Sequence, residues 1–215
     1  MKPFRSKLRF GALLTYCPRG EDGQYEKSRQ LMRAVKGNRI IGASDEPAAA
    51  FVARRIRELA PEQLVPEFLG NSDRVLVPIP RSSLLQKGAL WPALEIAEAL
   101  QREGFGRVMS CLARQSPVTK AATSPGQRPK AKDHFDSLSF DRFELPTKVT
   151  LVDDVVTRGA QLLGAAWRIW SDRPDVEIRG FAVIRTISAP ERFESILAPC
   201  TGKVEWRHEE CFREP

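Results

Sequence analysis

The most constraining feature of the sequence is the stretch of residues 149–161, which reads Val-Thr-Leu-Val-Asp-Asp-Val-Val-Thr-Arg-Gly-Ala-Gln. Its first four residues are apolar or β-branched, which predicts a short strand buried on both faces, as in a parallel sheet covered by helices. Asp153 and Asp154 follow at the expected carboxyl end of this strand, the edge at which open α/β sheets bind ligands. An apolar helix is expected over residues 160–170. The stretch therefore predicts an α/β fold with a ligand site at this edge.

The residues after the two acids indicate what the site binds. A small-residue turn that opens a helix presents several backbone N–H groups in one direction, and the helix dipole adds partial positive charge, so the turn is suited to a phosphate. The two carboxylates would repel that phosphate, but they suit the hydroxyls of an attached sugar or a hydrated Mg²⁺. We therefore expect a sugar phosphate, with a generic nucleotide-binding strand and helix as the alternative. This turn, called the site turn below, consists of Thr157, Arg158, Gly159, Ala160 and Gln161.

A second candidate loop follows the run Arg-Val-Leu-Val-Pro-Ile-Pro-Arg-Ser-Ser at residues 74–83. Residues 75–77 are expected to form a buried strand that the prolines end. Because the carboxyl ends of parallel strands meet at one edge, this loop is expected to face the same crevice as the acids. A guanidinium and two hydroxyls suit a second phosphate or a pyrophosphate, and a stiffened strand exit with an exposed arginine is the alternative. This loop, called the proline loop, consists of Pro80, Arg81, Ser82 and Ser83.

Residues 114–145 separate a strand expected at residues 108–113 from the acidic strand. A connection this long is usually functional or disordered. We expect a lid that closes over the ligand and brings a cation to a departing anion; a mobile basic excursion without a catalytic role is the alternative. His134 is expected to be a surface or packing residue rather than a base. The lid candidates are Arg114, Lys120, Arg128 and Lys130.

The remaining periodicity completes a parallel-sheet, three-layer α/β fold. Strands are expected over residues 8–16 and 176–187, and helices over residues 26–36, 48–59 and 91–102. We divide the chain into an amino-terminal accessory segment (1–70), a core (71–187) and a tail (188–215) that the sequence does not place. Trp206 in that tail is expected to serve in packing.

Composition narrows the classes of partner and compartment. The 215 residues carry a formal net charge of +7, which favours an anionic ligand, a nucleic acid or a membrane surface, with a simply basic surface as the alternative. The four cysteines lie far apart and there are only two histidines, which suggests neither a zinc site nor a disulfide framework and fits a reducing cytoplasm. No run approaches the ~20 apolar residues of a membrane span. We expect a soluble cytoplasmic protein that does not insert into membranes.

The motif at residues 149–161 resembles the 5-phosphoribosyl-1-pyrophosphate (PRPP) signature of the type I phosphoribosyltransferases, with Arg158 and Gln161 departing from the usual small or hydroxyl residues. The order of Lys36-Gly37, Val-Pro-Ile-Pro at residues 77–80, the long segment and the acids resembles the ComF-like, amidophosphoribosyltransferase-like branch, over roughly residues 30–187. The resemblance implies the type I phosphoribosyltransferase fold with a small amino-terminal hood at residues 1–70.

The same resemblance implies roles for the candidate residues. Asp153 and Asp154 would hold the ribose hydroxyls, the site turn the 5-phosphate and the proline loop the pyrophosphate, while Arg114 or Lys120 would close from the lid. Mg²⁺ would be carried by PRPP near the two acids, with no direct protein ligand. The implied activity is transfer of the phosphoribosyl group to a nitrogen nucleophile, a nucleobase or an amine, with release of pyrophosphate.

A hypothesis from another class stays open. The chain would then be a catalytically altered phosphoribosyltransferase fold that senses PRPP or a nucleotide, or an accessory protein in DNA uptake or other nucleic-acid handling, because the ComF-like branch is tied to uptake of DNA. A nucleic-acid or protein partner and a homodimer are left open by the sequence.

Overall fold

The computed structural model describes residues 5–42, 45–70, 73–118, 128–141 and 145–215. Its strands and helices follow in chain order. The strands are β1 (Lys7–Tyr16), β2 (Val75–Pro78), β3 (Arg107–Val108), β4 (Leu112–Arg114), β5 (Leu138–Phe140), β6 (Lys148–Val156), β7 (Glu177–Thr186), β8 (Leu197–Arg207) and β9 (Glu210–Glu214). The helices are α1 (Gly23–Gly37), α2 (Ala48–Leu59), α3 (Pro92–Arg102), α4 (Ala131–Asp136) and α5 (Ala160–Trp170), with short helical turns η1 (Val65–Leu69) and η2 (Pro190–Arg192).

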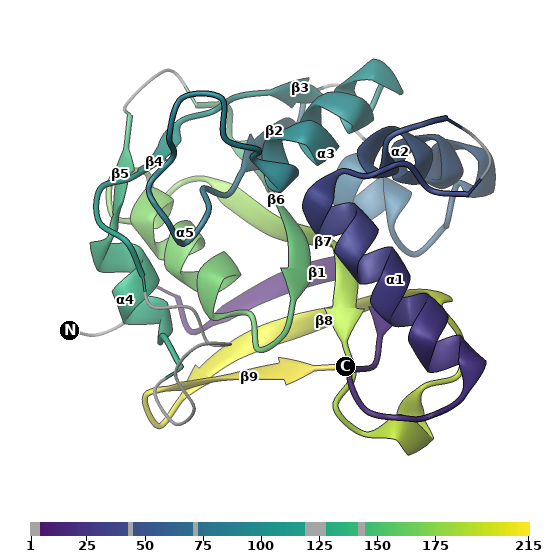
Figure 1. The fold of residues 1–215 in the computed structure, drawn as a ribbon. Coiled ribbons are helices and arrows are strands. Elements are labelled where there is room, and N and C mark those ends of the chain that lie inside the picture. Colours follow the sequence, from purple (N-terminus) through teal and green to yellow (C-terminus); the bar gives the residue numbers. More distant parts are fainter. Residues whose placement is uncertain (1–4, 43–44, 71–72, 119–127, 142–144) are drawn as a thin grey trace.

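The central element is a seven-stranded sheet with the strand order β3-β2-β6-β7-β1-β8-β9 (Figure 1). The strands from β3 to β1 run parallel, whereas β8 pairs antiparallel with β1 and β9 antiparallel with β8. Strand β6 lies inside the sheet between β2 and β7, which explains its apolar composition, because both of its faces are covered. The strands expected at residues 8–16, 75–77 and 176–187 are confirmed as β1, β2 and β7.

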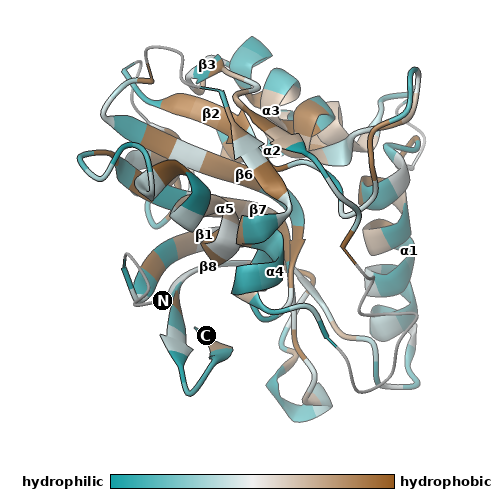
Figure 2. Cartoon of the chain, turned by 90° about the vertical axis from the view of Figure 1, so that its left-hand side faces the viewer, coloured by the Kyte–Doolittle hydropathy of each residue, from teal (hydrophilic) through white to brown (hydrophobic). Residues whose placement is uncertain are grey.

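Helices cover both faces of the sheet (Figures 1 and 2). On one face, buried side chains of α2, α3 and η1, including Ile56, Phe68 and Leu100, pack with Val152 and Phe181 of the sheet. On the other face, α5 packs its leucines and tryptophans against β1, β6 and β7, next to α4 and the small β4-β5 sheet. The predicted three-layer α/β fold is therefore confirmed, and the helices predicted over residues 48–59 and 160–170 have those bounds.

The region before the acidic strand differs from the prediction. The strand expected at residues 108–113 is divided between β3, at the edge of the main sheet, and β4, which pairs antiparallel with β5 in a separate sheet. The segment expected to be a structureless lid contains α4 and β5, which bury Ala131, His134 and Leu138. Short elements of this kind have little periodicity of their own and depend on tertiary packing for their stability.

Both ends of the chain contribute to the main sheet. Strand β1 comes from the segment expected as a hood and lies between β7 and β8, while β8 and β9 come from the tail that the sequence did not place. The division into hood, core and tail remains a prediction, but these strands are continuous with the sheet of the core. Trp206 of β8 packs edge-on against Trp167 of α5, with 5.2 Å between the ring centroids, which confirms its expected packing role.

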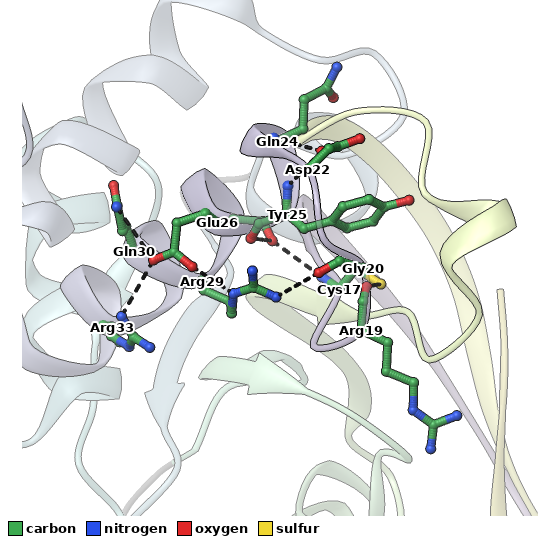
Figure 3. A network of polar contacts seen from close by, with 11 residues as sticks. Cys17, Arg19, Gly20, Asp22, Gln24, Tyr25, Glu26, Arg29, Gln30 and Arg33 are labelled. Carbon is green, nitrogen blue, oxygen red and sulfur yellow. Dashed lines mark hydrogen bonds and ion pairs between the residues drawn. The ribbon is translucent and has the colours of Figure 1, made fainter.

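A polar network fixes the start of α1 (Figure 3). Asp22 caps the helix by accepting two backbone N–H groups of the first turn, at 2.8 and 3.4 Å. Arg29 donates to the carbonyl of Gly20 at 3.2 Å, which ties the helix to the connection from β1. A side-chain cap of this type stabilises a helix by about 1 kcal/mol. The network therefore fixes the path of α1, whose last turn carries Lys36 towards the carboxyl edge of the sheet.

In the described part of the chain, no helix has the length and apolarity needed to span a membrane.

Close packing of α4 on α5 depends on Gly164. A Cβ at this position would lie 2.5 Å from the carbonyl oxygen of Ala131 and 2.6 Å from Cβ of His134. We predict that Gly164→Ala lowers the free energy of unfolding by about 1–3 kcal/mol, because the two helices must move apart. Gly23→Ala is the matched control, since its Cβ would meet no atom within 4 Å. Chemical denaturation of both variants measures the effect, and equal stabilities would contradict the close approach.

Candidate functional site

The two acids lie within the sheet, where β6 is still paired. Asp153 is opposite Ala182 of β7, and β6 continues to Val156, so the strand is longer than the four apolar residues predicted. The Asp153 carboxylate accepts the backbone N–H of Asp154 at 2.9 Å, and the Asp154 carboxylate accepts that of Val155, also at 2.9 Å. Each acid is therefore held by the N–H group of the residue that follows it.

Asp153 is electrostatically unusual. Asp153 is only 5% exposed. Burial raises the pKa of Asp153 well above its usual value, the neighbouring Asp154 carboxylate raises it further, and the nearby Lys36 ammonium acts in the opposite direction. Perturbed carboxylates that line a cavity are typical of functional sites. Ionisation of Asp153 therefore destabilises the folded state. The neighbouring Asp154 carboxylate is more accessible to solvent.

The site turn opens α5 as predicted. Gly159 has a φ of 83°, in the left-handed region that favours glycine, and caps the helix without a side-chain bond. A Cβ on Gly159 would lie 2.2 Å from Cγ2 of Val204 on β8, so no larger residue fits without movement. The hydroxyls of Thr157 and Thr186 lie 3.2 Å apart, which joins the turn to the end of β7. The helix N-terminus is thus presented at the sheet edge, where its N–H groups suit an anion.

Two adjoining cavities meet at the acids. The first, about 470 Å³, is bordered by the site turn, by α1 and by residues around α4. The second, about 640 Å³, is bordered by the proline loop, the start of α3 and both acids. Six residues line both cavities, so the two volumes form one crevice with the acids between an anion turn and a second loop. The shared residues are Lys36, Ser82, Asp153, Val155, Thr157 and Gln161.

The arginines of the two loops already have protein partners. Arg81 donates through Nη1 to the carbonyl of Leu90 at 2.7 Å, and Arg158 lies 3.4 Å from the Glu210 carboxylate of β9. The Ser82 hydroxyl lies 3.5 Å from Oε1 of Gln161, which links the proline loop to the site turn. The structure therefore brings the two loops predicted from sequence to one edge, as the parallel arrangement of β2 and β6 requires.

The lid candidates lie in different places. Arg128 lines the first cavity, and Lys130 precedes α4 and forms an ion pair with Glu209 at 3.4 Å. Arg114 is only 8% exposed, in β4, and is bonded to backbone carbonyls and to the Ser137 hydroxyl, so the expectation of a closing side chain is wrong for it. Lys120 lies outside the residues that the structure describes.

Sequence reasoning gave no role in the site to three residues. Lys36 borders both cavities, and its ammonium has neither a hydrogen bond nor an ion pair with any residue of the described ranges. The weak signal for it was the Lys-Gly pair at the end of α1. His134 is only 4% exposed and borders the first cavity, and burial lowers its pKa to about 4, so it is neutral at pH 7 and matches the expected packing residue. Arg213 of β9 reaches the site turn from the tail.

The side-chain donor atoms of the site limit how the protein could bind a metal ion. Among the described residues there is no cluster of three or more side chains of His, Cys, Asp or Glu that could form a metal cage. All four cysteines are free and buried. Paired carboxylates are hard oxygen donors of the kind that Mg²⁺ prefers together with water and phosphate oxygens. The pair of Asp153 and Asp154 therefore fits a magnesium ion that arrives with a phosphate ligand.

Comparisons with known proteins add little to this geometry. No family model matches the chain, and no curated protein matches it. A solved structure described as the glutamic acid mutant of an invariant aspartic acid in HPRTs, which are type I phosphoribosyltransferases, shares 13% sequence identity. The alignment covers 78% of this chain and 90% of that chain, with a TM-score of 0.34. A match of this strength says nothing about the ligand or the activity of the present chain.

The raised pKa of Asp153 predicts that this residue destabilises the fold at neutral pH. A carboxyl whose pKa is higher in the folded than in the unfolded state costs stability once the unfolded chain ionises, and the cost is complete above the folded-state pKa. We predict that Asp153→Asn raises the free energy of unfolding at pH 7 and that the gain disappears as the pH falls towards the unfolded-state pKa. Urea denaturation across this pH range measures it.

Asp175→Asn is the matched control. Its pKa is lowered by the hydrogen bond and charge of Arg173, so its ionisation stabilises the fold and this variant should lose stability at pH 7. A loss of stability in Asp153→Asn at pH 7 would contradict the prediction, because it would show that the Asp153 carboxylate stabilises the fold at this pH.

Proposed function

We propose that the protein binds PRPP with Mg²⁺ and transfers the phosphoribosyl group to a nitrogen nucleophile, with release of pyrophosphate. The observation that carries the proposal is the position of Asp153 and Asp154 in one crevice between two loops suited to anions. A ligand with one phosphate at each end and sugar hydroxyls between them matches this order of groups. The resemblance of residues 149–161 to the PRPP signature supports the same ligand.

In this proposal each group acts on a defined part of the ligand. The carboxylates of Asp153 and Asp154 accept hydrogen bonds from the ribose 2- and 3-hydroxyls, and the N–H groups of the site turn bind the 5-phosphate. The proline loop binds the pyrophosphate. Transfer breaks the bond between the anomeric carbon and the pyrophosphate oxygen, and the pyrophosphate leaves with the electron pair. A C–N bond forms to the acceptor nitrogen, whose proton passes to water. The protein positions the sugar and stabilises an oxocarbenium-like state and the departing charge.

Magnesium would neutralise charge on the pyrophosphate when it is bound. Asp153 and Asp154 are the residues that would lie near it, because the ligand's phosphate oxygens and water supply the rest of its coordination. Lys36 is the further cation of the shared wall, and we propose that its ammonium contacts the ligand close to the anomeric carbon, where the two cavities meet.

The ComF-like branch is also part of the proposal, since the Lys36-Gly37 pair and the Val-Pro-Ile-Pro run support it. A second function is favoured by one observation: the guanidinium groups of Arg81, Arg114 and Arg158 are all bonded to protein groups, which leaves few free cations to stabilise a departing charge. A site of this kind could bind PRPP or a nucleotide as a sensor, or serve an accessory protein in DNA uptake or other nucleic-acid handling.

Calorimetric titration of PRPP with Mg²⁺ tests the proposal. The wild type is expected to bind, and the Asp153→Asn, Asp154→Asn double variant is expected to lose binding, because Asn cannot reproduce the charged acceptors for both hydroxyls. Such charge-assisted hydrogen bonds are worth about 1.5–3 kcal/mol each, so the loss should exceed about a hundredfold. Unchanged binding in the double variant would show that PRPP does not bind at these two acids.

Pyrophosphate release with a panel of nucleobases and amines then separates enzyme from sensor. Turnover that depends on both PRPP and one acceptor supports the transferase, whereas tight binding of PRPP without turnover supports the sensor. Binding of single-stranded DNA that weakens steeply with salt would support a nucleic-acid role.

Lys36→Met tests the cation between the cavities. Its loss should weaken binding of PRPP by about tenfold, the order expected for one charged contact. Stability should fall only by the lost attraction to Asp153, because the Lys36 ammonium has no hydrogen bond or ion pair within the described residues. Lys27→Met is the matched control on the same helix, since Lys27 is exposed and borders neither cavity. Equal affinities of the two variants for PRPP would exclude Lys36 from the site.

A further inference from the structure

Two arginines hold the backbone of the two anion loops from behind. Arg114 of β4 donates through Nε to the carbonyl of Arg81 at 2.9 Å and through Nη2 to that of Pro80 at 3.1 Å. Its third contact is the Ser137 hydroxyl, which itself donates to the carbonyl of His134 at 2.9 Å. The small β4-β5 sheet and α4 are therefore bonded to the proline loop through one buried guanidinium.

Arg213 of β9 makes the corresponding contact on the site turn. Its Nε donates to the carbonyl of Thr157 at 2.6 Å, and its Nη2 donates to the carbonyl of Thr186 at the end of β7. The guanidinium is packed over the ring of Phe10, 5.7 Å from its centroid. The hairpin of β8 and β9 is thus bonded to the turn that opens α5, and Val204 of the same hairpin contacts the turn at Gly159.

Holding a carbonyl also orients the N–H group on the other side of the same peptide. The peptide unit is planar and trans, so its C=O and N–H point in opposite directions. Arg114 therefore orients the N–H of Ser82 through the carbonyl of Arg81, and Arg213 orients the N–H of Arg158 through the carbonyl of Thr157. Neither of these two N–H groups donates to another residue within the described ranges, which leaves both for a ligand.

Both guanidinium groups also contribute charge. Burial lowers the pKa of Arg114 and of Arg213 to about 10, so both remain protonated at neutral pH. A fixed positive charge behind each loop favours an anion in front of it, as oriented backbone amides do. The two residues come from separate sheets, because β4 belongs to the small sheet with β5 and β9 to the main sheet (Figure 1). The hydrogen bonds of Arg114 go to the proline loop and those of Arg213 to the site turn.

We propose that Arg114 and Arg213 are positioning residues, each of which prepares one anion loop, so that Arg213 governs affinity for the 5-phosphate and Arg114 affinity for the pyrophosphate. This inference rests on the proposed function for the identity of the two anions. Neither residue touches the ligand. A purely structural role would instead weaken both ends of the site together.

The test uses ligand fragments that each occupy one end. Ribose 5-phosphate and magnesium pyrophosphate are titrated separately into the wild type and into Arg213→Met and Arg114→Met. Arg213→Met is expected to weaken ribose 5-phosphate by about tenfold or more and to leave pyrophosphate unchanged, and Arg114→Met to do the reverse. Arg173→Met is the matched control, because Arg173 also donates to a backbone carbonyl, that of Leu145 at 3.0 Å, and borders neither cavity.

A conservative variant and a direct measurement of the backbone complete the test. Arg213→Lys and Arg114→Lys keep the charge but not both hydrogen bonds, so each should recover part of the lost affinity, and they replace the methionine variants if these fail to fold. The backbone amide chemical shift, measured by NMR, should change at Arg158 in the Arg213 variants only, and at Ser82 in the Arg114 variants only, because each peptide loses the bond to its carbonyl.

Equal losses for both fragments, or amide chemical shifts that change at both loops in each variant, would overturn the inference. If the wild type binds neither fragment, the proposed function fails. The amide chemical shifts then still decide whether each arginine holds its own loop.

Discussion

Parallel pairing of β2 and β7 with the two sides of β6 is the constraint on which the rest of the site depends. The register places Pro78, the last residue of β2, opposite Val152, directly before the acids, while β6 and β7 continue side by side to Val156 and Thr186, so that all three strands end on the same side of the sheet. The proline loop, the acids and the site turn therefore emerge together at one edge, although residues 80 and 157 are far apart in the chain. Loops held in this way by a rigid sheet can be specific for a ligand without being structured by it.

The cost of this arrangement is concentrated at Asp153. A buried carboxylate next to a second one is electrostatically unfavourable, and the pKa of Asp153 is raised for this reason. Lys36 and the N–H of Asp154 offset part of the cost. A fold selected for stability alone would place an apolar or neutral residue there, since most buried charges that lack a paired partner destabilise their proteins. A conflict of this kind between local chemistry and the surrounding core is what is expected at functional positions.

Much of the site was predictable because its signals are local. The β-branched run, the two acids and Gly159 lie within thirteen residues of each other, and the strand and helix that they predict are β6 and α5. The proline loop was predictable for the same reason. The division of residues 108–113 between two sheets was not, because β4 and β5 are short and their apolar residues Leu112, Leu138 and Phe140 are buried among neighbours distant in the chain.

The role of the chain's last strands shows why such information is missing from the local sequence. Nothing in the run Glu-Cys-Phe-Arg-Glu of β9 indicates an anion site. Its arginine matters because β8 turns back along β1 and places β9 at the end of the sheet, from which one guanidinium reaches the carbonyls of Thr157 and Thr186. Arg114 acts in the same way on the proline loop. The local sequence thus predicts the acids and the two loops of the candidate site, whereas the arginines bonded to the backbone of those loops are placed by long-range pairing and become visible only in the folded chain.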